Sequence, residues 1–136
     1  MSSGNEILYS PVIDYSGRAG ASTNITLWWY RDCDGYNTSG YNTEGVTVYL
    51  NTSVSASGAT TLGFIPRRGG KATSGSYISG TSTTTTTGWY QYTFSVPTTF
   101  NTSTNYILLK FVSQYGDNCY LDDIQYTAYP PGCSGT

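Results

Sequence analysis

Two adjacent carboxylates, Asp122 and Asp123, are the first candidates for chemistry in this sequence. They lie in the segment YLDDIQY, which also carries the apolar residues Leu121 and Ile124. These two apolar residues are three positions apart, so the regular alternation of a strand cannot bury both, and a bulge or twist beside the carboxylates would resolve the conflict. Bulges often lie beside functional sites, and carboxylate oxygens are ligands that Ca²⁺ prefers. The pair therefore indicates ligands for a hard cation, or else a surface pair that caps a turn.

The residue types present in the chain exclude several classes of catalytic and metal site. The chain contains no histidine, which excludes Ser-His and Cys-His nucleophiles and His-rich metal sites. A glycosidase needs two carboxyl groups across a cleft, and neighbours such as Asp122 and Asp123 on a regular strand point to opposite faces. A second acid would have to come from Glu6, Asp14, Asp32, Asp34 or Glu44. We therefore predict a protein that is not an enzyme.

Three cysteines, Cys33, Cys119 and Cys133, leave one thiol unpaired in any disulfide scheme. Cys33 follows the strand-like TLWWYRD, and Cys119 precedes the strand-like YLDDIQY. If these strands are antiparallel neighbours, the two thiols lie at the same end of one sheet. We predict a Cys33–Cys119 disulfide and hence an oxidising compartment. Three reduced thiols in a cytoplasmic protein are the alternative.

The elements that must position these residues read almost throughout as strands. Apolar residues recur with a period close to two in segments bounded by Gly, Pro, Asn or Ser, which predicts about eight strands. These segments are 6–11, 12–17, 24–32, 45–53, 60–66, 88–97, 106–114 and 120–128. The segment 106–114 is apolar on both faces and is predicted to be a central strand. Two long stretches, 34–44 and 69–87, read as loops.

Composition supports an all-β domain and limits its partners. Only 10% of the 136 residues are charged and the net charge is −2, so no basic stripe could neutralise a row of phosphates. Nucleic-acid binding is therefore not expected. No apolar stretch approaches the roughly 20 residues that span a bilayer, so membrane insertion is not expected either. The start of the chain lacks the pattern of a signal peptide, so a signal was removed or never existed. We predict one domain over 1–129, followed by a flexible tail or linker over 130–136.

The order of several segments resembles a known family. The succession is WWYRD, GVTVYLNTS, SGATTLGFIPR, GWYQYTFSVPTTF and NYILLKFVSQYGDNCYLDDI, which spans roughly 27–124. It is similar to the galactose-binding-like jelly-roll domains of the MAM and cleaved-adhesin families, which recur in secreted bacterial surface proteins. The resemblance implies a two-sheet antiparallel β-sandwich of jelly-roll type, a calcium ion near the first and last strands, and adhesion to glycans or proteins.

The resemblance also suggests which residues would hold the calcium ion. Because the first and last strands of a jelly roll lie close together, Glu6 and Asp14 are the expected partners of Asp122 and Asp123. Asp32 and Asp34, in YRDCDGYN, give a second and weaker candidate loop, whose alternative is a simple Asp-Gly turn.

Exposed aromatic side chains are the other candidate binding element. Alternation along 24–32 places Trp29 in the core and Trp28 on the opposite face, and alternation along 88–97 places Trp89 outside. Tyr49 is placed outside in the same way. Sugar rings stack on flat aromatic faces, and Tyr-rich polar surfaces also suit protein contacts. Trp28, Tyr49 and Trp89 are therefore the candidate ligand-binding residues, unless each only forms the rim of core packing.

These observations predict a calcium-stabilised, non-catalytic adhesion or carbohydrate-binding module at the cell surface or outside the cell. Its partner would be a glycan or a cell-surface protein. The alternative is a structural subunit of a fibre, appendage or virion that assembles through exposed strand edges.

Overall fold

The computed structural model describes residues 4–31, 44–66, 88–113 and 120–132. Seven strands form within these residues: β1 Gly4–Tyr9, β2 Asn24–Arg31, β3 Gly45–Asn51, β4 Thr60–Pro66, β5 Gly88–Ser95, β6 Tyr106–Ser113 and β7 Tyr120–Gln125. The described ranges contain no helix long and apolar enough to cross a membrane.

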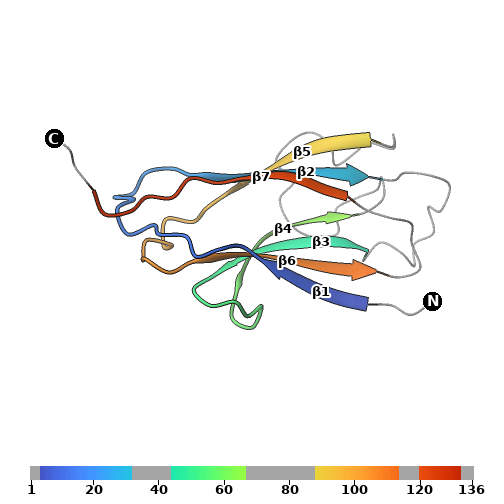
Figure 1. Cartoon of the computed structure of the whole chain (residues 1–136), viewed down its shortest axis with the longest axis horizontal. Coiled ribbons are helices and arrows are strands. Elements are labelled where there is room, and N and C mark those ends of the chain that lie inside the picture. The colour runs from blue at the N-terminus through green and yellow to red at the C-terminus, as the bar shows by residue number, and fades with distance from the viewer. Residues whose placement is uncertain (1–3, 32–43, 67–87, 114–119, 133–136) are drawn as a thin grey trace.

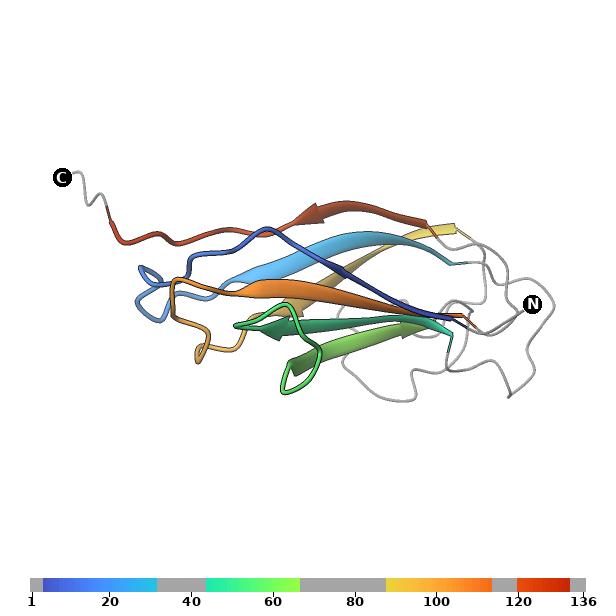
Figure 2. The ribbon, with the colours of Figure 1, turned by 60° about the horizontal axis from the view of Figure 1, so that its bottom comes forward.

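The strands form two antiparallel sheets that pack face to face. One sheet has the order β1-β6-β3-β4, and the other has the order β5-β2-β7. Figures 1 and 2 show the two layers, with β7 and β1 at edges of their sheets. The predicted all-β class and two-sheet antiparallel sandwich are therefore confirmed.

The core lies between the sheets and follows the predicted alternation. Val46, Val48 and Leu50 on β3 have no exposed surface, whereas the residues between them are half-buried. Trp29 on β2 is buried and stacks on Phe111 of β6, with ring centroids 6.1 Å apart, so this aromatic pair joins the two sheets. Burial of large side chains from both layers provides the main driving force for holding them together.

The strand β6 is central, as its two apolar faces predict. It pairs with β1 on one side and β3 on the other. Ile107 and Leu109 belong to the core, and Leu108 is fully buried although it points to the opposite side of the sheet.

The segment 12–17 was expected to be a strand, and this prediction is wrong. It forms only an isolated bridge between Ile13 and Asn105. Ile13 and Tyr15 are buried in alternation, which explains the strand-like pattern. Their backbone partners, however, lie in the loop before β6: the N–H of Tyr15 donates to Thr102 O at 2.9 Å. The Asn105 side-chain amide also donates to Ile13 O at 3.0 Å, so the segment is held without a ladder.

A buried arginine ties this region to the loop after β5. The guanidinium of Arg18 donates to the carbonyls of Ala21 at 2.6 Å, Val96 at 2.7 Å and Pro97 at 2.7 Å. It lies 5.9 Å from the ring centroid of Tyr15. Only 2% of Arg18 is exposed, so backbone carbonyls take the place of water around the charge.

Candidate functional site

A row of three aromatic side chains crosses the sheet β5-β2-β7. Strand register places Tyr30 of β2 opposite Trp89 of β5 on one side and opposite Tyr120 of β7 on the other. The ring centroid of Tyr30 lies 5.6 Å from that of Trp89 and 5.6 Å from that of Tyr120, and both contacts are edge-to-face. Trp89 is 46% exposed and Tyr120 is 50% exposed, and Tyr30 between them is half-buried, so both ends of the row lie open to solvent.

Trp28 extends this surface along β2. It lies two residues from Tyr30 and therefore on the same face of the strand. Its cross-strand neighbours are Gln91 on β5 and Asp122 on β7, which place an amide and a carboxylate beside its half-buried ring. We call the surface around Trp28, Tyr30, Trp89 and Tyr120 the aromatic face.

The structure unites two of the three predicted aromatic residues. Trp28 and Trp89 lie on the aromatic face, and Trp29 is in the core, as alternation predicted. Tyr49 is half-buried on β3, opposite Leu108 of β6, and so belongs to the other sheet. It therefore cannot contribute to one site with the two tryptophans.

The candidate ligand-binding residues predicted from the sequence did not include Tyr30 or Tyr120. The signal for both was present in the alternation, since Tyr30 shares a face with Trp28 and Tyr120 shares one with Asp122. What the sequence lacked was the cross-strand register, which brings Tyr120, Tyr30 and Trp89 into contact.

The irregularity predicted beside the carboxylates is present. Register between β2 and β7 shifts between Thr26 and Trp28, and Asp123 has a φ of 49°, in the left-handed region. Asp tolerates this conformation better than most residues. Asp122 Oδ1 accepts a hydrogen bond from the Asp123 N–H at 2.8 Å, and the Gln125 amide donates to Asp123 Oδ1 at 3.2 Å. Both carboxylates thus have a structural role in the bulge.

The four predicted calcium ligands do not come together. No group of three acidic, Cys or His side chains that could hold a metal ion exists among the described residues, which include Glu6, Asp14, Asp122 and Asp123. Asp14 Oδ1 instead accepts hydrogen bonds from the Ser16 N–H at 2.8 Å and from Ser16 Oγ at 2.6 Å. The described residues therefore form no site that all four share, and calcium binding itself stays a prediction. The second candidate loop, with Asp32 and Asp34, lies outside the described residues.

The premise of the disulfide prediction is met. The strands β2 and β7 are antiparallel neighbours, with Tyr30 opposite Tyr120. Along the chain, β2 ends two residues before Cys33, and β7 begins directly after Cys119. Cys33, Cys119 and Cys133 lie outside the described residues, so the Cys33–Cys119 bond stays a prediction.

The chemistry available on the aromatic face is that of recognition. Aromatic rings offer apolar surfaces on which the C–H faces of a sugar ring can stack, while Gln91 and Asp122 offer hydrogen-bond partners for hydroxyl groups.

Comparisons with known proteins add no evidence on function to that of the aromatic face. No family model, no curated protein sequence and no solved structure matches the chain. The resemblance to MAM and cleaved-adhesin domains therefore stays an expectation from the sequence.

Proposed function

We propose that the protein is a non-catalytic, extracellular carbohydrate-binding module that uses the aromatic face to adhere to glycans. The observation that carries the proposal is the row of Trp89, Tyr30 and Tyr120, which spans all three strands of one sheet and is exposed at both ends, with Tyr30 half-buried between them. A cluster of large aromatic side chains at the surface of a soluble domain often marks an interaction site.

Because the aromatic row lies on a sheet, its side chains are already held in place before a ligand binds. Each ring is braced by its neighbour at 5.6 Å, and the backbones beneath are paired in register. A rigid platform loses little conformational entropy when a ligand binds, which is an advantage for a weak ligand such as a sugar. Protein ligands could use the same aromatic groups, and a glycan is favoured because polar side chains flank the rings at Gln91 and Asp122.

A glycan array with the intact chain tests this proposal. We expect binding to one or more polysaccharides and loss of that signal in Trp89→Ala and Tyr120→Ala. The matched control is Tyr9→Ala, which removes a tyrosine that is 57% exposed on the other sheet, and this variant should bind normally. Absence of binding to every glycan, or equal loss in the control, would contradict the proposal.

A second function, assembly through strand edges, is favoured by β1. This edge strand pairs only with β6 among the described residues, and it exposes Ile7 (45%), Leu8 (52%) and Tyr9 (57%). Leu8 and Tyr9 also line an apolar groove of about 220 Å³ that is bordered by Ile124 of β7. Apolar edge strands are templates for pairing with another chain.

Sedimentation and electron microscopy at physiological salt test this alternative. Assembly through β1 predicts concentration-dependent oligomers or filaments that Ile7→Lys abolishes, since a lysine on an edge strand opposes pairing. A monomer at all concentrations would exclude it for the conditions measured.

A further inference from the structure

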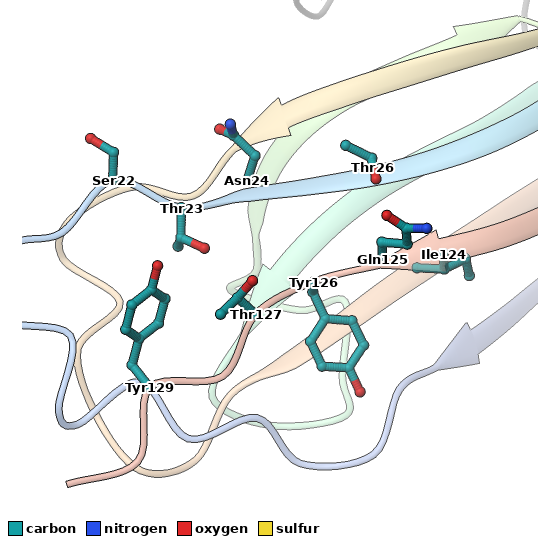
Figure 3. Close-up of a pocket in the computed structure, with 9 residues that line it drawn as sticks. All are labelled: Ser22, Thr23, Asn24, Thr26, Ile124, Gln125, Tyr126, Thr127 and Tyr129. Atoms are coloured by element: carbon teal, nitrogen blue, oxygen red, sulfur yellow. The ribbon is translucent and has the colours of Figure 1, made fainter. Parts of the chain in front are cut away.

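A polar groove lies at the end of the same sheet, where β2 begins and β7 ends (Figure 3). Its volume is about 640 Å³. The lining residues come from the loop before β2 and the start of β2, and from the end of β7 and the segment that follows it: Ser22, Thr23, Asn24, Thr26, Ile124, Gln125, Tyr126, Thr127 and Tyr129. We call this the polar groove.

The lining of the polar groove carries no charged side chain. It presents hydroxyl groups, two side-chain amides at Asn24 and Gln125, and two tyrosines. Figure 3 shows the Tyr129 side chain reaching from the C-terminal segment toward Thr23 on the opposite wall. Hydroxyls and amides can both donate and accept hydrogen bonds, which suits a ligand with many neutral hydroxyl groups. A charged ligand would find no countercharge there.

The polar groove forms where two segments of the chain move apart. Pairing between β2 and β7 ends at Thr26 and Gln125, and the chain after Gln125 then leaves β2. The Tyr129 N–H donates to Asp14 O at 2.7 Å, and the Gly17 N–H donates to Tyr129 O at 2.7 Å. These bonds to the segment between β1 and β2 hold the far wall of the groove in place.

Strand register makes the polar groove continuous with the aromatic face. Tyr30, Trp28, Thr26 and Asn24 follow one another along one face of β2. The last two line the groove, and the first two form the aromatic face. The distance along β2 from Tyr30 to Asn24 is about 20 Å at the usual rise per strand residue.

We propose that the aromatic face and the polar groove are two ends of one binding surface for an uncharged, linear polysaccharide that runs along β2. This inference rests on the proposed function and adds the ligand class and the second end of the site. The length of the surface accommodates several sugar rings, so the chain is bound along its length rather than at one terminal residue. The exposed carboxylate of Asp122, between the two ends, disfavours an anionic glycan.

Calorimetric titration with oligosaccharides of increasing length tests the inference. The probes are soluble xylan, mannan and mixed-linkage β-glucan, their fragments from disaccharide to hexasaccharide, and polygalacturonate as the anionic comparison. We expect a neutral polysaccharide to bind, and the affinity for its fragments to rise until a fragment reaches both ends of the surface. An affinity that is equal for disaccharide and hexasaccharide, or a preference for polygalacturonate, would overturn the inference.

Substitutions in the groove separate this inference from the proposed function. Asn24 and Thr127 are exposed, so the double variant Asn24→Ala with Thr127→Val should keep its melting temperature. It should lose about tenfold in affinity for the hexasaccharide, as expected for one to two lost hydrogen bonds, and none for the disaccharide. The control Thr61→Val, exposed on the other sheet, should match the unmodified protein.

The pattern of losses distinguishes the two failures. If the groove variant binds the hexasaccharide normally while Trp89→Ala does not bind, the polysaccharide does not reach the groove and only this inference fails. If only an anionic glycan binds the unmodified protein, this inference fails and the proposed function stands, whereas absence of binding to every glycan ends both.

Discussion

At the scale of single residues, Arg18 makes a larger contribution to stability than its place in a loop suggests. Its guanidinium satisfies carbonyl groups of Ala21, Val96 and Pro97, and it is almost fully buried. Replacement by methionine keeps a side chain of similar reach but removes the guanidinium donors to Ala21 O and Val96 O, while Pro97 O keeps the Phe100 N–H at 3.1 Å. We expect Arg18→Met to lower the free energy of unfolding by about 3 kcal/mol.

Urea denaturation measures this loss, with Lys110→Met as the control. Lys110 is half-buried on β6, and its replacement should change the free energy of unfolding by less than about 1 kcal/mol. Equal stability of Arg18→Met and the unmodified protein would show that the carbonyls find other donors.

Asp14 gives a prediction about pH. The hydrogen bonds from the Ser16 hydroxyl and the Ser16 backbone N–H lower the pKa of Asp14 below its ordinary value. Folding therefore favours the charged carboxylate, so its contribution to stability is present above the ordinary pKa and is lost as the pH falls through the lowered pKa of the folded state. Urea midpoints at a series of acidic pH values should show Asp14→Asn and the unmodified protein converging as the pH falls. A difference that stays constant with pH would contradict this.

At the scale of elements, the bulge in β7 explains the adjacent carboxylates without a ligand. Asp123 has a left-handed backbone at φ 49°, which a β-branched side chain adopts with difficulty. We expect Asp123→Gly to keep the stability of the protein and Asp123→Val to lower it by about 1–2 kcal/mol. Ser95→Val is the control, because Ser95 is exposed at a regular position of β5. Thermal melts of the three variants measure these differences in stability. An Asp123→Val protein as stable as the unmodified protein would show that the backbone at Asp123 is not constrained.

The elements also show what alternation can and cannot predict. The buried faces of β3 and β5 were predictable because a strand alternates, and the bulge was predictable because Leu121 and Ile124 could not both fit a regular strand. The segment 12–17 alternates as well, yet its partner is a loop that only the folded chain brings near. The contact of Tyr30 with Tyr120 depends on register between distant strands, which the sequence does not contain.

The polar groove was equally invisible in the sequence, for a different reason. Its walls, 22–26 and 124–129, are far apart in the chain, and it exists only because they diverge after Gln125. Hydroxyl and amide residues in loops are common, so their types alone gave no signal.

At the scale of the whole molecule, the placement of the carboxylates makes a prediction about metal removal. Among the described residues, neither Glu6 nor Asp14 joins Asp122 and Asp123 in a group that could hold a metal ion. Melting temperatures should be compared with excess calcium and with chelator, for the unmodified protein, Asp122→Asn and Asp123→Asn. Whatever the size of the calcium-dependent shift in the unmodified protein, we expect both variants to show the same shift. A smaller shift in either variant would place a calcium ion at this pair and contradict our account of the bulge.

The central claim is that the exposed aromatic row binds sugar while the buried aromatic core holds the fold. Trp89 and Trp29 lie on neighbouring strands and differ in exposure, at 46% and 1%. Calorimetric titration of the best polysaccharide from the array, with parallel thermal melts, should be made on Trp89→Ala, Trp29→Ala and the unmodified protein. The account predicts that Trp89→Ala loses binding but melts near the unmodified protein, whereas Trp29→Ala is destabilised by about 3–5 kcal/mol. Full binding by a folded Trp89→Ala protein would contradict it.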